Sequence, residues 1–487
     1  MKITTDLKRI LDIAITLTAE KNYSKLLDNI ISECMDISNC DAGTLYILND
    51  NKLKFMILRN HTMKVYRGGN GEPIDSMPPV ALDDKYVCAH SAIYKETVNV
   101  LDVYNDSSFD WQGPKKYDSI TGYHTQSMLV VPLIDHDNKV IGVLQLINAL
   151  DENGDITCFS VDSENIVFSI ASEAAISLSN MILVKQLRDM LYSFVSSLTT
   201  AIDARTPYNA NHTFNVARYC DEFAKFLMKE EKERDDFWTI TESEREQLVM
   251  AAMVHDVGKL ITPLEIMNKP DRLDWRLPLM ESRWKYFEAL LKIDLYDKII
   301  SDEEYNDAIS KVKEAKNLIR SCNTAPFLDQ GKLDAIKALK ELTVINRTDG
   351  EKVEFLTDEE LHEMLVVKGT LTQEERKIIE MHVTYTDRLL SKISFQDDFK
   401  LVRSFASAHH EYLDGSGYPK GLKGEDLPLE VRIMTISDIY DSLTADDRPY
   451  KKAVPKERAL SILSSMAEEG KLDKELVGLF TEYIKQN

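Results

Sequence analysis

The chain has 487 residues, which is too long for a single hydrophobic core, so we expect two or three domains. Its net charge of −22 argues against non-specific binding to DNA or RNA. No run of roughly eighteen apolar residues is present, so we expect no membrane span. Six scattered cysteines lack the spacing of metal or disulfide sites, which indicates reduced thiols and a cytoplasmic protein.

The first 160 residues alternate between helical and strand patterns. Apolar residues at three- and four-residue steps predict helices near 7–17 and 26–34, followed by strands at 42–48 and 54–58. The polar, glycine-containing stretch 61–79 is expected to be a loop, and 87–94 a short helix. Two further strands, 127–133 and 140–148, flank a hairpin turn at 135–138. This order predicts an α+β domain in which helices flank an antiparallel sheet.

Residues 161–200 carry the longest uninterrupted helical pattern. The apolar positions step by three and four residues, first at Val167, Ala171, Ala174, Leu178 and Met181, then at Val184, Leu187, Leu191, Phe194 and Leu198. A seam of this length favours a parallel two-helix coiled coil, and hence a homodimer. The alternative is one amphipathic helix packed on its own domain.

Histidine and aspartate then recur in contexts that suit metal ligands. His255 and Asp256 end an apolar run, and burying them is costly unless a metal ion or polar partners satisfy them. Lys259 stands four residues after His255, so we expect the two to share a helix face. Further candidates are His212 in a helical context, His382 after a Thr372–Glu375 capping box, and Asp438 near the end of another apolar run.

Two adjacent histidines, His409 and His410, open a stretch that continues with an acidic, glycine-rich turn as far as Pro419. Gly415 and Gly417 allow backbone conformations that are closed to bulkier residues. This combination predicts a metal site beside a backbone that approaches a ligand closely.

The ordered set His212, His255-Asp256 and Asp438 resembles the HD phosphohydrolase superfamily. His382, His409-His410 and Gly417-Tyr418-Pro419 narrow the resemblance to the HD-GYP subfamily, over about residues 197–470. The resemblance implies an all-helical domain that hydrolyses a cyclic dinucleotide, usually cyclic di-GMP, to pGpG or GMP. It also implies two metal ions, typically iron or manganese, because mixed imidazole and carboxylate ligation suits them.

The resemblance also assigns roles by position. His212, His255, Asp256 and Asp438 would bind one metal, and Asp256 would bridge to a second metal on His382, His409 and His410. Lys259 would act with Asp256 in catalysis by stabilising charge on the phosphoryl oxygens. Arg448 and Lys451 would clamp the second phosphate, and Tyr418, between Gly417 and Pro419, would stack on a guanine base. Some members bind a third metal through a glutamate where this chain has Tyr208, so two metals are expected.

The N-terminal pattern resembles a GAF domain, on the stretches Tyr117–Ser127 and Ile141–Asn148. Nucleotide-binding GAF domains carry a set of Asn, Lys, Phe, Asp and Glu positions. Asn148, Asp151 and Glu152 match that set, whereas Ala149 and Leu150 replace the Lys and Phe. The domain is therefore expected either to bind another small ligand or to serve as a packing and dimerising module.

The predicted organisation is a GAF-like sensor at 1–160, a connecting helix at 161–200 and an HD-GYP domain at 201–487. Residues 271–367 interrupt the HD-GYP pattern and are expected to form a mostly helical insertion. Two alternatives to a GAF-regulated cyclic di-GMP phosphodiesterase remain open. One is a non-catalytic receptor for the dinucleotide, and the other is a hydrolase of hybrid cyclic GMP-AMP.

Overall fold

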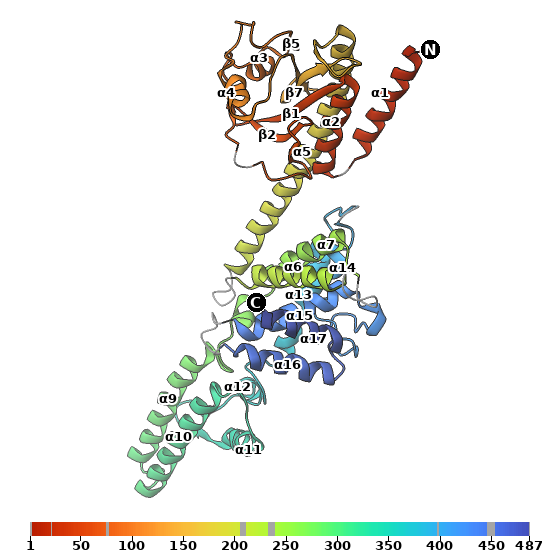
Figure 1. Ribbon diagram of the computed structural model, residues 1–487. Helices are drawn as coiled ribbons and strands as arrows, with labels where there is room; N and C mark the ends of the chain where they lie inside the picture. The colour runs from red at the N-terminus through yellow and green to blue at the C-terminus, as the bar shows by residue number, and fades with distance from the viewer. Residues whose placement is uncertain are drawn as a thin grey trace. The chain divides into compact units, whose positions relative to one another are not determined.

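The computed structural model describes residues 2–20, 22–74, 77–204, 211–231, 239–396, 399–445 and 453–486. It divides into two compact units, Met1–Leu191 and Tyr192–Asn487 (Figure 1). The expected class is confirmed, because an α+β unit with an antiparallel sheet is followed by a helical unit.

An antiparallel sheet forms the centre of the N-terminal unit. Its strands are β1 (Cys40–Asn49), β2 (Lys52–Asn60), β3 (Val65–Gly68), β4 (Val80–Ala81), β5 (Val98–Val100), β6 (Met128–Ile134), β7 (Val140–Leu150) and β8 (Ile156–Thr157). The order is β3-β2-β1-β7-β6-β5, with β4 paired to β2 and β8 to β7. β3 lies inside the stretch 61–79 that was expected to be a loop. It is a short edge strand, and its half-buried residues leave no clear alternation in the sequence.

Helices cover both faces of this sheet. They are α1 (Lys2–Ala19), α2 (Tyr23–Ser38), α3 (Val87–Tyr94) and α4 (Gln112–Thr121). One hydrophobic core joins α1, α2 and the first half of α5 (Val161–Asp203) to strand residues such as Leu45 and Leu144. A second core on the other face contains α3 together with Val103 and Trp111. The central strands are buried on both faces for this reason.

Helix α5 has two different halves. Val167, Ala171, Ala174 and Leu178 are buried in the N-terminal core, so this part of the expected dimer seam packs on its own unit. Further along, Val184, Leu187 and Phe194 are exposed. Among the described residues, α5 alone is long and apolar enough to span a membrane, although a helix buried in a protein core meets the same criteria.

The C-terminal unit is built from helices packed around α15. Its elements outside the insertion are α6 (His212–Glu231), α7 (Glu242–Val254), η1 (Val257–Leu260), α8 (Leu264–Met267), α13 (Gln373–Leu390), α14 (Val402–Ala406), η4 (Gly424–Asp426), α15 (Leu429–Thr444), α16 (Lys456–Glu468) and α17 (Lys474–Gln486). The Phe480 ring of α17 contacts the rings of Phe223 on α6 and Tyr440 on α15, which ties the three helices together. α7, α13 and α14 complete the core on which the candidate site is built.

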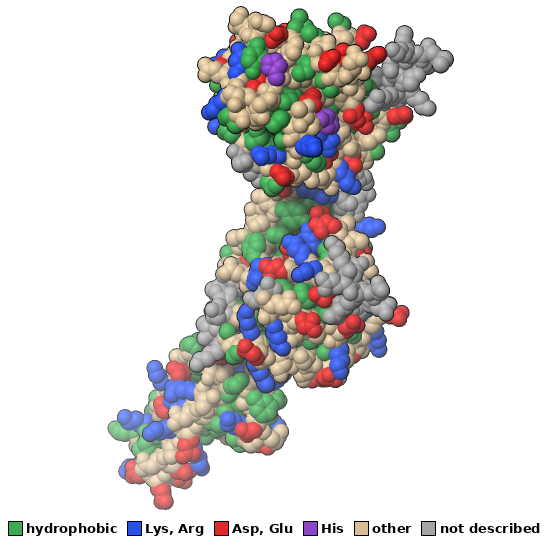
Figure 2. Space-filling model, viewed as in Figure 1, with side chains coloured by type: hydrophobic (Ala, Val, Ile, Leu, Met, Phe, Trp, Pro, Cys, Tyr) green, Lys and Arg blue, Asp and Glu red, His purple; other side chains and the backbone are tan. Residues whose placement is uncertain are grey.

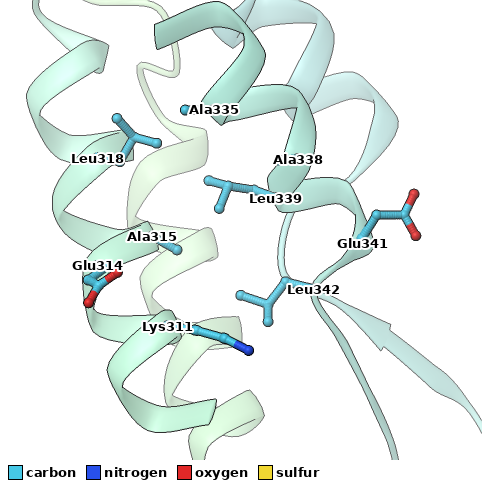
Figure 3. Close-up of a pocket in the computed structure, with 9 residues that line it drawn as sticks. All are labelled: Lys311, Glu314, Ala315, Leu318, Ala335, Ala338, Leu339, Glu341 and Leu342. Carbon is cyan, nitrogen blue, oxygen red and sulfur yellow. The ribbon is translucent and has the colours of Figure 1, made fainter. Parts of the chain in front are cut away.

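The stretch 271–367, which is called the insertion here, is mostly helical and has a hydrophobic core of its own. It contains α9 (Arg276–Tyr296), α10 (Asp302–Asn323), α11 (Gln330–Ala338), η2 (Leu339–Glu341), β9 (Thr343–Ile345), β10 (Lys352–Glu354) and α12 (Asp358–Met364). Its core is separate, with the rings of Trp284 and Phe355 stacked at 4.9 Å. An open groove of about 530 Å³ lies between α10 and the α11–η2 segment (Figure 3).

Buried charges join the insertion to the rest of the C-terminal unit. The Lys269 ammonium donates to Glu375 of α13 at 2.8 Å and lies 3.4 Å from Glu363 of α12. Within the insertion, next to this junction, Arg272 is buried and its guanidinium donates to the carbonyls of Val366, Cys322 and Ala325, which holds the two ends of the insertion together. Removing one partner from such a buried arrangement is costly, so the junction is expected to be well ordered.

Candidate metal centre

Seven side chains that the sequence singled out come together in the C-terminal unit. His212 begins α6, and His255 and Asp256 follow directly after α7. His382 lies on α13, which starts with the expected capping box of Thr372 and Glu375. His409 and His410 follow α14, and Asp438 is on α15. The ends of several helices thus converge on one buried point.

The site consists of two groups of ligands on either side of one carboxylate. Nitrogen and oxygen atoms of His212, His255 and Asp256 lie within 4.8 Å of one another, and so do those of His382, His409 and His410. Asp256 faces both groups, with Oδ2 3.2 Å from His255 Nε2 and Oδ1 3.4 Å from His382 Nε2.

Asp438 provides a second carboxylate that lies close to a histidine of each group. Its Oδ1 lies 3.1 Å from His212 Nε2, and its Oδ2 lies 3.9 Å from His410 Nδ1. Both carboxylates are buried, so their charge is not screened by bulk water. The four oxygens and the imidazole nitrogens around them form a compact, mostly buried set of donor atoms.

The histidine rings are held by hydrogen bonds on their other nitrogen. Nδ1 of His255, His382 and His409 lies 2.6–2.7 Å from the carbonyl oxygens of Ala252, Ile379 and Ala406. Each of these carbonyls is three residues earlier in the chain, so the local helix geometry fixes the ring. Nδ1 therefore donates, which leaves Nε2 unprotonated and directed into the site, as in metal-binding histidines.

Asp441 is a site residue that the sequence reasoning missed. Its Oδ2 accepts a hydrogen bond from His212 Nδ1 at 2.7 Å, and its side chain is buried. The signal was present, because Asp441 follows Asp438 by three residues and residues at this spacing share one face of a helix. An aspartate in this position orients the imidazole and raises its basicity.

Burial and neighbouring charge set the protonation of the site. Burial lowers the pKa of His382 and His409, and it lowers that of His410 to about 4, so these rings are neutral at pH 7. Burial also lowers the pKa of His212, but hydrogen bonds to Asp438 and Asp441 outweigh it and raise this pKa to about 10. A positive charge, from a proton or a metal ion, is therefore favoured between His212 and Asp438.

Asp256 is held in its ionised form. Burial raises the pKa of its carboxyl, but Lys259 and His255 outweigh this effect and hold the pKa well below its usual value. Lys259 Nζ donates directly to Asp256 Oδ2. The expected shared helix face of His255 and Lys259 is wrong, because α7 ends at Val254 and Lys259 lies on the 3-10 turn η1. The tighter turn directs the ammonium to Asp256.

The Gly-Tyr-Pro segment borders the site beside His410. The Tyr418 ring lies 4.8 Å from the His410 ring, and the Tyr418 N–H donates to the His410 carbonyl. A Cβ on Gly417 would lie 2.5 Å from that carbonyl oxygen, so only glycine fits. The buried Glu411 carboxylate accepts N–H groups of Lys420 and Leu422 and closes the loop after Pro419.

Three residues of the predicted site lie outside the described residues. Arg448 and Lys451 were expected to bind the second phosphate. Tyr208 stands where some members of the resembled family have a glutamate that binds a third metal. In the N-terminal unit, Asn148 is buried and its amide bonds the Gln126 N–H and the His124 carbonyl. The Asp151 carboxylate accepts the N–H groups of Asn153 and Asp155 in the turn after β7, and Glu152 is exposed, so two of the three matches to the GAF nucleotide-binding set have a role in the fold.

The donor set fits metal ions. The buried Nε2 of His255 makes no hydrogen bond within the part of the chain that the structure describes, although its ring is fixed through Nδ1. An orphaned imidazole nitrogen that points at a carboxylate is costly unless a cation lies between them. Neutral imidazoles with carboxylates are ligands that iron, manganese and zinc share.

Family models match most of the chain. A GAF domain model matches residues 22–178, and two HD domain models match residues 209–349 and 358–476. Among curated proteins, the chain is 26% identical over 273 residues to 3'3'-cGAMP-specific phosphodiesterase 3 of Vibrio cholerae, covering 56% of this chain and 35% of that protein.

Two further relatives match a shorter stretch more closely. A cyclic di-GMP phosphodiesterase of Thermotoga maritima is 37% identical over 124 residues, covering 25% of this chain and 33% of the relative. The cyclic di-GMP phosphodiesterase response regulator RpfG of Xanthomonas campestris is 41% identical over 110 residues, covering 22% and 28%. The chain thus spans about a third of the length of these relatives.

The helical C-terminal unit and its buried histidine-aspartate site are of the HD domain type. The two HD domain models together match more than half of the chain, so the chain belongs to the HD domain family, and it carries a GAF domain on the N-terminal side.

Proposed function

We propose that this chain is a metal-dependent phosphodiesterase that hydrolyses cyclic di-GMP to pGpG or GMP under the control of its GAF domain. The observation that carries the proposal is the position of Asp256, whose two carboxylate oxygens face two separate groups of histidines. A pair of metals that share one carboxylate is a recurrent design for cleaving phosphate esters. The names of the relatives support this class of substrate.

The proposed ligands follow from the distances. His212, His255, Asp256 and Asp438 would hold one ion, and Asp256 would bridge to the second ion on His382, His409 and His410. Bound iron or manganese would supply Lewis acidity and a water of lowered pKa. Because the pKa of each of the three histidines in the second group is lowered, these rings are available as ligands at neutral pH without loss of a proton.

The remaining residues would bind and orient the dinucleotide. Lys259, less than a quarter exposed, would stabilise negative charge on a phosphoryl oxygen beside Asp256. Tyr418 would stack on a base, and its position against His410 keeps such a base beside the site. Gly417 and Pro419 shape the loop that carries Tyr418, and Arg448 with Lys451 would bind the second phosphate.

A hybrid cyclic GMP-AMP is the second candidate substrate. The relative with the longest match reported above is named for 3'3'-cGAMP, whereas the two more identical relatives are named for cyclic di-GMP. Both dinucleotides have the same phosphodiester backbone, so the site can cleave either and the choice depends on contacts to the bases. Measuring kcat/KM for both substrates in one mixture decides between them.

The α5 helix supports a homodimer. Its exposed residues Leu183, Leu187, Met190 and Phe194 alternate at steps of four and three, and the preceding position in this series, Asn180, is exposed. One polar Asn in an otherwise apolar seam favours a parallel pair in a fixed register. We propose that this pair connects a ligand of the GAF domain to the activity of the site. Six free cysteines fit a cytoplasmic protein.

The experiment that tests the enzymatic proposal uses the full chain loaded with iron or manganese without oxygen. It should convert cyclic di-GMP to linear product, and Asp256→Ala should lose bound metal and activity together because the shared ligand is gone. Asp387→Ala is a matched control, since this carboxylate pairs with Arg403 on the surface. A stable complex with unmodified dinucleotide would instead indicate the non-catalytic receptor.

A further inference from the structure

The first helix of the insertion, α9, has an exposed apolar stripe that neither the metal site nor the GAF domain uses. The stripe comprises seven exposed positions at alternating steps of four and three residues: Trp275, Leu279, Ser282, Tyr286, Ala289, Ile293 and Tyr296. Tyr296 is 86% exposed, and Leu279 57%. Figure 2 shows hydrophobic side chains on the surface of the insertion among acidic and basic ones.

The opposite face of the same helix is already buried. Met280, Trp284, Phe287 and Leu290 belong to the core of the insertion, where they pack against α10 and the segment around Phe355. The helix is therefore apolar on two faces. A helix that is apolar on two faces normally has both covered, so the second face needs a partner. The α9 stripe extends over the full helix, which is about 31 Å long.

The spacing specifies what kind of partner fits. An alternation of four and three over several turns is the heptad repeat, which keeps one seam facing a neighbouring helix in a left-handed coil. Leu279, Tyr286 and Ile293 occupy one seam position, and the other is occupied by Trp275, Ser282, Ala289 and Tyr296. In a parallel pair each seam position faces the same position of the other copy, so the layer of Tyr286 rings lies between the small layers of Ser282 and Ala289, which leave room for it.

The charges beside the seam favour a second copy of α9 in parallel orientation. Lys285 and Lys292 line one flank. The other flank carries Leu290 and Asp297 together with Arg276 and Arg283, which are already paired with Glu363 and Glu360 of the same chain. In a parallel pair each flank faces the opposite flank of the partner, which brings Lys292 to Asp297 of the second copy. In an antiparallel pair like flanks meet, and Lys285 would face Lys292 of the other copy.

We propose that the α9 stripe is a self-association surface at which the insertions of two copies of this chain pair through a parallel two-helix coiled coil. This surface is distinct from the exposed seam on α5. It gives the insertion, which contributes none of the seven candidate ligands, a role in assembly.

Disulfide trapping in the full chain tests this pairing. Ser282→Cys puts a thiol in the seam, and Cys158→Ser removes the exposed native thiol from the background. Lys313→Cys, exposed on α10 of the same insertion, is the matched control. Under mild oxidation at low micromolar protein, the seam variant should form the covalent dimer at least about tenfold faster, because pairing raises the effective thiol concentration to millimolar.

Two additional changes test the seam and the orientation. Adding Leu279→Glu should reduce cross-linking to the level of the control while the circular dichroism spectrum stays unchanged, because this side chain is exposed in the single chain. Asp297→Lys should slow cross-linking, because Lys292 of one copy would then face a second positive charge on the other copy. Adding Lys292→Glu should restore the rate. Equal rates for the Ser282→Cys and Lys313→Cys variants, or no recovery in the charge swap, would overturn the parallel self-pairing.

Discussion

The hydroxyl of Thr386 donates a hydrogen bond to the main-chain carbonyl of His255 at 2.8 Å and accepts one from the Gly258 N–H at 3.0 Å. One buried side chain on α13 thus satisfies two backbone groups on either side of Asp256. It also lies one turn after His382 on the same helix. This link fixes the distance between the two groups of proposed metal ligands, although Thr386 itself has no ligand atom in the site.

Replacing Thr386 with valine should therefore weaken metal binding without removing a ligand. Valine has the same shape, but it leaves the His255 carbonyl and the Gly258 N–H unsatisfied, at a cost of about 1–3 kcal/mol for each group. We expect a lower metal content after dialysis and a lower midpoint in urea unfolding. Thr386→Ser keeps the hydroxyl and is the control. Equal metal retention in the valine and serine variants would show that the link has no effect on the site.

A second prediction concerns Asp441, which holds the His212 ring. Asp441→Asn removes the negative charge that keeps Nδ1 protonated and Nε2 available, so the affinity for the first metal should fall by about 10- to 100-fold. Competition with a chelator of known affinity measures this change. Asp387→Asn, which changes a surface carboxylate on α13, should leave the affinity unaltered. An unchanged affinity in Asp441→Asn would mean that Asp441 does not orient the ligand.

Patterns of burial explain which parts of the molecule could be predicted from the sequence. His255 and Asp256 stood out because polar residues that end an apolar run need a partner, and the strands β1 and β7 stood out as apolar runs. The capping box of Thr372 and Glu375 marked the start of α13 correctly. These features depend on neighbours in sequence, which a single chain displays directly.

The features that were missed depend on contacts between distant residues or on small changes in backbone geometry. Spacing predicted a shared face for His255 and Lys259, but the helix tightens into a 3-10 turn after Asp256. The first half of the expected seam on α5 packs into its own unit, because the sheet offers an apolar face that periodicity cannot reveal. The two apolar faces of α9 overlap in the sequence, and only the structure separates them.

A third prediction concerns Lys259. Its ammonium contacts Asp256, and we propose that it stabilises charge on the phosphoryl oxygens in the transition state. Lys259→Ala should keep bound metal, because no ligand is lost, yet lower kcat by about 100-fold or more, as is typical when one such donor is removed. Lys377→Ala, on the exposed face of α13, is the control. Unchanged turnover in Lys259→Ala with full metal content would refute the assigned role.

A final prediction uses the close approach of η1 to α13. A Cβ on Gly258 would lie 1.9 Å from the His382 carbonyl oxygen and 2.6 Å from the Thr386 nitrogen, and both atoms are backbone. Gly258→Ala must therefore push α13 away from Asp256, which should lower the stability of the C-terminal unit by about 1–3 kcal/mol.

The same shift moves His382 away from Asp256, so the Gly258→Ala protein should also lose metal from the second group of ligands. Gly478→Ala is the matched control, because this glycine is inside α17 with open space around its Cβ position. There alanine should stabilise the protein by about 0.5–1 kcal/mol through its higher helix propensity. Urea unfolding followed by circular dichroism, with metal analysis of the same samples, compares the two. If Gly258→Ala matched Gly478→Ala in stability and metal content, the packing of η1 on α13 would not set the geometry of the site.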